Sequence, residues 1–329
     1  MCTNLQPVSF ELKVNNIMQN KDNVTWVMPA LNSGQYINDT LSSIAEFIPS
    51  SHELIIYDNG STDDTVPIAK SWFDGRISGF VMENAPLSLG LCRQRLLELA
   101  SNDWIRLIDS DDTVTSRCWE SQLDLLRSNS KLGAVGTQMQ LVSADSKTLL
   151  GITGYPIRPI DVHLSFLSHD NPVGNPSVMM KKEAAIAVGG YRDVILEDHE
   201  FWIRMLTGFD ICNLDSVGIN YRVHPASYTH QNARARVLGD QQIKNLISNH
   251  SSFGLGRNEF EQFICGKFNF RTLFRMLKYL RRRYRVDSEA VLTLSCSLRN
   301  RFSQRSGYGL LGRVVRKSLL LQTGNRGKG

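Results

Sequence analysis

Residues 104–112 read Trp104-Ile105-Arg106-Leu107-Ile108-Asp109-Ser110-Asp111-Asp112, which places three carboxylates directly after a largely apolar run. The run predicts a buried strand. In open α/β sheets, ligands bind outside the carboxyl ends of the strands, and clustered carboxylates favour a hard cation. The alternative is that Asp111, Asp112 or Thr113 caps the helix predicted over 119–126, but a cap needs only one acid or two. The stretch therefore predicts a metal or ligand site at a strand end.

The first half of the chain alternates short apolar runs with segments of helical periodicity. Strands are predicted over 24–28 (closed by Pro29), 54–57, 77–82 and 104–108, with helices over 36–47, 63–72 and 87–100 between them. Repeated β-α units predict an α/β fold with a Rossmann-like, mostly parallel sheet flanked by helices. After residue 133, strands at 133–142, 178–180 and 216–221 mix with helices at 181–188 and 197–206.

Composition is that of an ordinary soluble protein. The chain has 329 residues, 42% of them apolar, enough for one large α/β domain with an appendage. Its apolar runs fall far short of the about 20 residues that a membrane-spanning helix needs. The N-terminus lacks the basic and apolar pattern of a secretory signal. Six scattered cysteines argue against a zinc knuckle and a disulfide framework. We expect a cytoplasmic protein with reduced cysteines.

Charge divides the chain near residue 250. Residues 251–329 hold 17 Lys and Arg against four acids, whereas the first 250 hold 20 against 28. Apolar residues at 270, 273, 274, 277 and 280 recur at helical spacing beside arginines and lysines, which predicts a basic amphipathic helix. We therefore divide the chain into an N-terminal extension (1–22), a main domain (23–248) and a mainly helical, basic C-terminal region (249–329).

The basic C-terminal region has three possible interpretations. An anionic membrane surface would attract its cations and take up its apolar stripe. Nucleic acid is a second candidate, and packing of the stripe on the main domain is a third. A second apolar stretch with basic residues, Tyr308–Leu321, favours membrane contact. We therefore expect no nucleic acid partner, and a cytoplasmic protein that can lie peripherally on the inner face of the membrane.

A second acidic segment, residues 58–65, follows the second predicted strand. Asp58 would then lie at the same sheet edge as Asp109 and Asp111. The plainer interpretation is local, because Asn-Gly at 59–60 favours a tight turn and Ser61 or Thr62 makes a good N-cap.

Three further candidates have equally plain alternatives. Residues 197–200, Glu-Asp-His-Glu, open a predicted helix, where acids commonly face the positive end of the helix dipole. His224 follows an apolar strand, and a lone histidine is more often structural than a ligand. Arg93 and Arg95 lie on the helix after residue 87 and could face a phosphate or the solvent.

The ordered set of motifs is more specific than any one of them. It comprises Met28-Pro29-Ala30-Leu31-Asn32, residues 58–65, residues 107–112, Pro176-Ser177-Val178-Met179, Val188-Gly189-Gly190-Tyr191, Glu197-Asp198 and Tyr221-Arg222-Val223-His224-Pro225. This set closely resembles the glycosyltransferase family 2 proteins, inverting enzymes with the GT-A fold, over about residues 23–230. The chain beyond 250 lies outside the resemblance.

The resemblance implies a role for each matching residue. Pro29 and Asn32 would line the nucleotide pocket, Asp58 would contact the donor base or ribose, Asp109 would lie near the ribose, Asp111 and His224 would hold a divalent metal, Mn²⁺ or Mg²⁺, at the donor diphosphate, and Asp198 would be the catalytic base. We add Arg93 to the donor-binding set as a phosphate contact. One departure is Asn59, where the family usually has a second acid.

The implied activity is inverting transfer of a sugar from a nucleotide-diphosphate sugar, a UDP-sugar foremost, to a hydroxyl of a glycan or lipid-linked acceptor. Asp198 would take the hydroxyl proton while the metal stabilises the leaving diphosphate. One alternative is a non-catalytic nucleotide-binding or glycan-binding GT-A domain docked by its basic region. Another is a sugar nucleotidyltransferase, which would need a phosphate clamp near the N-terminus that the sequence lacks. Loop shapes, those of residues 164–175 above all, would set donor and acceptor.

Overall fold

The computed structural model describes residues 22–73, 77–83, 86–167, 171–225 and 227, together with Arg275, Lys278, Tyr279 and Arg282. The predicted N-terminal extension and nearly all of the basic C-terminal region lie outside the described residues. The division of the chain into three parts therefore stays a prediction.

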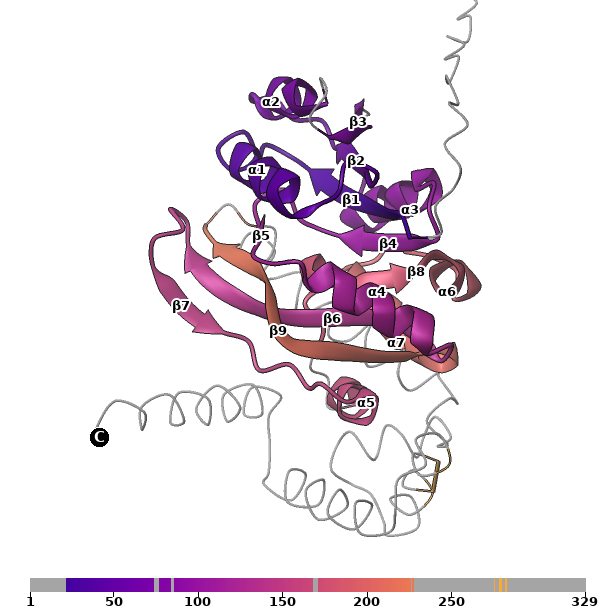
Figure 1. Ribbon diagram of the computed structural model, residues 1–329. Coiled ribbons are helices and arrows are strands. Elements are labelled where there is room, and N and C mark those ends of the chain that lie inside the picture. Colours follow the sequence, from indigo (N-terminus) through magenta and orange to yellow (C-terminus); the bar gives the residue numbers. More distant parts are fainter. Residues whose placement is uncertain are drawn as a thin grey trace, which may run out of the picture.

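The described chain alternates strands and helices in the predicted order (Figure 1). The strands are β1 (Val24–Ala30), β2 (Glu53–Asp58), β3 (Ser78–Glu83), β4 (Trp104–Leu107), β5 (Thr113–Val114), β6 (Leu132–Ser143), β7 (Leu149–Ile152), β8 (Met179–Lys181) and β9 (Asp210–Val223). The helices are α1 (Ile37–Phe47), α2 (Thr65–Trp72), α3 (Leu89–Leu99), α4 (Cys118–Ser128), α5 (Pro159–Leu167), α6 (Lys182–Ala187) and α7 (Glu197–Gly208), with a 3₁₀ turn at Asn175–Ser177.

These strands form one sheet in the order β3-β2-β1-β4-β8-β6-β9-β5, with β7 paired to β6. Strands β1, β2, β3 and β4 are parallel to one another, as the repeated β-α units predict. β8 lies between β4 and β6 and is antiparallel to both, so it joins these four strands to the rest of the sheet. The predicted α/β fold is confirmed.

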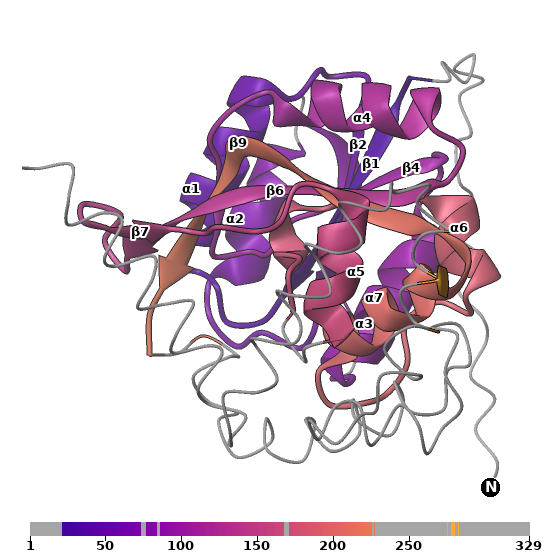
Figure 2. The ribbon, with the colours of Figure 1, turned by 90° about the horizontal axis from the view of Figure 1, so that it is seen from below.

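Side chains of the central strands alternate between two apolar cores. In β1, Trp26 and Met28 face the core under α1, α2 and α4, whereas Val27 faces the core under α3, α5, α6 and α7. Figure 2 shows α4 on one face of the sheet and α3, α5, α6 and α7 on the other. Because both faces are covered, the carboxyl-terminal edge of the parallel strands is where loops remain to form a site.

β1 runs two residues further than predicted. The sequence places its end at Met28, before Pro29, but pairing with β2 continues to Ala30. Pro29 is tolerated because its missing N–H points toward the β4 side, where the last paired residues are Val27 and Leu107. The strand therefore ends at Ala30, two residues closer to the loops of the site than the sequence predicts.

Sequence patterns miss helix α5 and the two short strands β5 and β7. Residues 164–167 lie in the last turn of α5, where a loop is expected, and only 171–175 of that loop are described. Pro159 occupies its first position, which suits a helix start. Ile160, His163 and Phe166 are buried at intervals of three. This spacing is the signal that could have predicted the helix.

Of the basic C-terminal region, Tyr279 shows a contact. Its ring packs on the core beside α5, with its centroid 6.3 Å from that of His163. Arg275, Lys278 and Arg282 are exposed. The residues of the apolar stripe itself (270, 273, 274, 277 and 280) lie outside the described residues, so the three interpretations of the stripe stay predictions. Within the described part of the chain, each helix is too short or too polar to cross a bilayer.

His52 provides a test of the core beneath α1 and α4. Its side chain is buried, its Nδ1 accepts a hydrogen bond from Trp26 Nε1 at 3.4 Å, and its ring lies edge-on to Trp119. Burial lowers the pKa of His52 to about 4. The unfolded chain, with an ordinary histidine pKa, therefore binds more protons between about pH 4 and 6.5. The stability due to neutral His52 is complete above 6.5 and is lost as pH falls toward 4.

We expect His52→Gln to flatten the acid dependence of stability. Urea unfolding at pH 7 and at pH 4.5 should show a smaller difference in unfolding free energy for the variant than for the natural chain. The reduction should be at most about 3 kcal/mol. Equal differences for the two proteins would mean that His52 is not held neutral by the fold.

Candidate functional site

The loops after β1 and β2 are joined by backbone-to-side-chain hydrogen bonds. Asn32 donates its N–H to Ser61 Oγ at 2.8 Å, and its side-chain oxygen accepts the N–H of Thr62 at 2.9 Å. Asn32 has φ +48°, a left-handed conformation that asparagine tolerates better than most residues. Asn32 thus fixes the edge of the expected nucleotide pocket by holding two loops together.

Asp58 ends β2 and binds its own turn. Its carboxylate is buried and accepts the backbone N–H of Gly60 at 3.2 Å and of Ser61 at 3.1 Å. The predicted N-cap at Ser61 or Thr62 is wrong, because α2 begins at Thr65 and has no side-chain cap. Asp58 therefore shapes the turn, with its carboxylate at the same sheet edge as the carboxylates after β4.

Asn59, the departure from the family pattern, uses both halves of its amide. Its Nδ2 donates to the carbonyl oxygen of Leu87 at 2.9 Å, and its Oδ1 accepts the Leu87 N–H at 2.7 Å. A carboxylate can accept but cannot donate, so an acid could not make this pair. Asn59 consequently anchors the segment that leads into α3.

The three acids after β4 have three different partners. Asp109 pairs with Arg93 at 3.2 Å, and Asp111 meets His224 at 2.9 Å. Asp112 is buried and accepts the backbone N–H of Arg222 at 2.9 Å. Burial and its acidic neighbours raise the pKa of Asp112 well above its usual range. Helix α4 begins at Cys118 with no side-chain cap, so the capping alternative is wrong.

Asp111 and His224 form the pair that could hold a divalent cation. His224 is buried, its Nε2 lies 2.9 Å from Asp111 Oδ2, and its ring lies on that of Tyr36 with the centroids 4.6 Å apart. Adjacent ligands about 2.1 Å from an octahedral ion stand about 3 Å apart, so this spacing fits a chelating pair. No cluster of three or more His, Cys, Asp or Glu side chains occurs among the described residues, and the remaining ligands would have to come from substrate or water.

Arg93, predicted as a donor-binding residue, pairs with carboxylates of the protein. It is buried on α3, and besides Asp109 its guanidinium pairs with Glu197 at 3.2 Å. Although burial acts against its charge, the carboxylates of Asp109 and Glu197 raise the pKa of Arg93 above its ordinary value. Arg95, on the same helix, is exposed and pairs with Glu98. Two carboxylates therefore engage the guanidinium of Arg93, and its role in donor binding stays a prediction.

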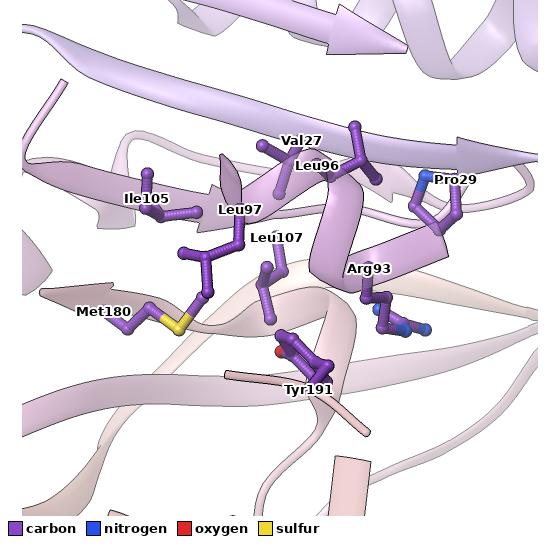
Figure 3. Close-up of a pocket in the computed structure, with 9 residues that line it drawn as sticks. All are labelled: Val27, Pro29, Arg93, Leu96, Leu97, Ile105, Leu107, Met180 and Tyr191. Carbon is purple, nitrogen blue, oxygen red and sulfur yellow. The ribbon is translucent and has the colours of Figure 1, made fainter. Parts of the chain in front are cut away.

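A small cavity lies beside Arg93 and Pro29. Figure 3 shows these two residues at one end and Ile105 and Met180 at the other. Its volume of about 10 Å³ leaves room for one water molecule at most. Pro29 is half-buried at this place, so it supports the site edge from below.

Asp198 is the second residue of α7. Its carboxylate accepts a hydrogen bond from Asn171 Nδ2 at 3.1 Å and from the N–H of His199 at 2.7 Å. Its charge reaches the strand end after β4, because Asp198 contributes to the raised pKa of Asp109. Its two acidic neighbours in the first turn, Glu197 and Glu200, are paired with arginines. Among the described residues, Asp198 forms no ion pair.

The site thus gathers most of the predicted residues at one edge of the sheet. Sequence patterns miss Glu197, Asn171, Asn175 and Tyr36, which position the expected residues. In the sequence, Glu197 is singled out only because it directly precedes Asp198. The other three gave no signal because each is joined to the site through contacts between distant segments.

The family model "Glycosyl transferase family 2" matches residues 25–155. The chain carries a glycosyl transferase family 2 domain. The matched segment holds the loops after β1 and β2 and the acids after β4. The family expected from the motif order is confirmed, and the chain is a glycosyltransferase.

Proteins similar to this chain are also named as glycosyltransferases. The putative glycosyltransferase EpsE of Bacillus subtilis is 27% identical over 60% of this chain and 72% of its own. The UDP-Glc:alpha-D-GlcNAc-diphosphoundecaprenol beta-1,3-glucosyltransferase WfgD of Escherichia coli is 24% identical over 62% of this chain and 78% of its own. The mannosyltransferase PcManGT of Pyrobaculum calidifontis, solved with GDP-Man and Mn²⁺, is 16% identical, with a TM-score of 0.55 over 91% of this chain and 80% of its own. The GT-A fold is confirmed.

We expect Asn59→Asp, which restores the acid usual in family 2, to destabilise this chain. The substitution removes the donor to the Leu87 carbonyl and sets a carboxylate against it, at a cost of about 1 kcal/mol. Asn38→Asp is the matched control, because exposed Asn38 serves as an acceptor, for Trp72 Nε1. Urea unfolding at pH 7 should separate the two variants. Equal stability would show that the two-way amide pair contributes nothing.

Proposed function

We propose that this chain is an inverting glycosyltransferase that transfers a sugar from a UDP-sugar to a hydroxyl of a glycan or lipid-linked acceptor. The observation that carries the proposal is that Arg93 pairs both with Asp109, two residues before the Asp111–His224 pair, and with Glu197, directly before Asp198. These groups divide into a donor side, beside β4, and an acceptor side, at the start of α7.

The donor side would bind the nucleoside diphosphate. Asp58 and Asn32 would face the base and ribose, with Pro29 beneath them, and Asp109 would lie near the ribose. Loops tied to one another, as those after β1 and β2 are, lose little entropy when a ligand binds. We propose uridine as the base, because WfgD is named for UDP-Glc, while the GDP-Man in PcManGT makes guanosine the main competitor.

Asp111 and His224 would hold a divalent metal, Mn²⁺ or Mg²⁺, and the Mn²⁺ in PcManGT supports this choice. When bound, such an ion stabilises the negative charge of the leaving diphosphate. The protein then needs no acid to protonate that group. Burial of His224 against Tyr36 would keep the imidazole pointed at the ion.

Asp198 would act as the base. An acceptor hydroxyl is a poor nucleophile at neutral pH, so removal of its proton as it attacks the anomeric carbon contributes about 10²–10⁴ in rate. Attack from the face opposite the diphosphate inverts the anomeric centre. Asn171 would orient the carboxylate through its hydrogen bond.

We propose a lipid-linked acceptor as the first to test, because WfgD is named for one. The basic C-terminal region would then bring the enzyme to the inner face of the membrane, with the chain otherwise in the cytoplasm. An apolar, basic stretch is attracted to anionic lipid by both of its components.

We expect Asp198→Asn to bind donor normally and to transfer no sugar. Calorimetric titration with UDP and Mn²⁺ should give a Kd within about threefold of the natural chain. Release of UDP from UDP-glucose and UDP-N-acetylglucosamine, with glycans and diphosphoundecaprenol-linked sugars as acceptors, should fall at least about 100-fold. Asp215→Asn, an exposed substitution on β9, serves as the control. Near-normal transfer by Asp198→Asn would remove this residue from the base role.

We expect Asp111→Asn to abolish the effect of metal on donor binding. In the natural chain Mn²⁺ should strengthen UDP binding at least about tenfold, and the variant should bind UDP equally with Mn²⁺ and with a chelator. The same titrations with GDP, TDP and CMP test the choice of base. A variant that keeps the full response to Mn²⁺ would place the metal elsewhere, and no binding of any nucleotide by the natural chain would point to a non-catalytic domain.

A further inference from the structure

Helix α3 and the segment before α7 approach each other unusually closely. A Cβ on Gly90 of α3 would lie 2.0 Å from the carbonyl oxygen of Arg192, so only glycine fits there. On the other side, Gly190 has φ +61°, which favours glycine, and a Cβ there would meet the side-chain amide of Gln94. Gln94 also accepts the N–H of Tyr191 at 2.8 Å. Two glycines and a hydrogen bond therefore fix this junction.

Arg93 lies inside the junction and has acceptors on three segments. Its Nη2 donates to Asp109 Oδ1 after β4, and its Nε donates to Glu197 Oε1 at the start of α7, each at 3.2 Å. In the amide orientation that its neighbours require, Asn175 also accepts from Nη1 and from Nη2, the latter at 3.2 Å. The planar guanidinium presents donors on three nitrogens in fixed directions, whereas an ammonium group has three rotatable donors on a single nitrogen.

Glu197 is held by Arg93 in a place where a carboxylate would otherwise not be charged. Its side chain is buried, and burial together with the neighbouring Asp198 raises the pKa of Glu197 to about 7, against the attraction of Arg93. Leu196, directly before it, has φ +58°, a left-handed conformation that is strained for a leucine. Strain of this kind persists where the surrounding contacts force a particular chain direction.

The other buried ion pair of α7 provides a contrast. Glu200 and Arg204 pair along the helix, and Arg204 also donates to the carbonyl oxygens of Val188 and Gly190, away from the acids after β4. This pair fixes α7 to the preceding loop. Among the ion pairs of α7 in the described part of the chain, only the Arg93–Glu197 pair reaches the donor side of the site.

We infer that Arg93 and Glu197 are positioning residues that hold the base Asp198 at a fixed distance from the donor-binding Asp109. The inference rests on the proposed function, in which Asp198 takes the acceptor proton. A single rigid group between the two sides keeps the acceptor hydroxyl in line with the anomeric carbon. Misplacement by about 1 Å lowers the rate of such a step by about 10²-fold without weakening ground-state binding.

The test uses Arg93→Lys, Glu197→Gln and the double variant in the full chain. Lysine keeps the charge but reaches fewer acceptors, and glutamine keeps an oxygen for Arg93 Nε without the charge. We expect kcat to fall about 100-fold for Arg93→Lys and about tenfold for Glu197→Gln, while the Kd for UDP with Mn²⁺ stays within about threefold. The double variant should be no slower than Arg93→Lys, because both changes break one unit.

Glu200→Gln is the control for a merely structural role. It weakens a buried pair on the same helix and should lower the unfolding free energy with little change in kcat. Three results would overturn the inference. The first is that Arg93→Lys and Glu197→Gln lose UDP affinity as much as kcat, the second is that the losses add in the double variant, and the third is an unchanged kcat. If Arg93→Lys fails to fold, Glu197→Gln decides alone. Failure of the proposed function is distinguished by Asp198→Asn, which would then retain transfer.

Discussion

Burying a guanidinium is costly unless carboxylates compensate its charge, and Arg93 lies where two of them meet. Its pairing with Asp109 and Glu197 makes the carboxyl-terminal edge of the sheet a single unit, because one carboxylate follows β4 and the other begins α7. Removing Arg93 would leave the carboxylates of Asp109 and Glu197 without a compensating charge. The geometry of the proposed site depends on this compensation, because Arg93 donates directly to Asp109 and to Glu197, the residue before Asp198.

The fold was predictable because several independent signals agree. Apolar runs of strand length, helical periodicity between them and β-α alternation all indicate a parallel sheet, and β1, β2 and β4 form accordingly. The errors are local. β1 passes Pro29 because the neighbouring strand has already ended, and α5 was missed because its buried positions lie in a segment read as a loop. The first error depends on β4, a neighbour distant in sequence, whereas the second could have been avoided from the spacing of Ile160, His163 and Phe166.

The site was predictable only in part. Asp58, Asp109 and Asp111 follow strands, so the topology alone brings them to one edge. The pairing of Asp111 with His224 joins residues 113 positions apart, and spacing gives no indication of it. Arg93 was the least predictable residue. From sequence it and Arg95 are equivalent cations on one helix, but rotation by two residues places one in the interior and the other in solvent. The order of the family motifs indicated roles for Asp198 and His224 that helical and strand periodicity did not indicate.

The first turn of α7 shows how environment separates like residues. Glu197, Asp198 and Glu200 all lie where the helix dipole favours a negative charge. Glu197 is compensated by Arg93, and Glu200 by Arg204, whereas Asp198 is left with hydrogen bonds from an amide and a backbone N–H. Hydrogen bonds from neutral donors orient a carboxylate and still leave it a lone pair with which to accept a proton. Arg93 and Arg204 pair with Glu197 and Glu200 and leave the carboxylate of Asp198 without an ion pair among the described residues. This arrangement suits Asp198 to the proposed role of base, so the Arg93–Glu197 pair should affect the rate.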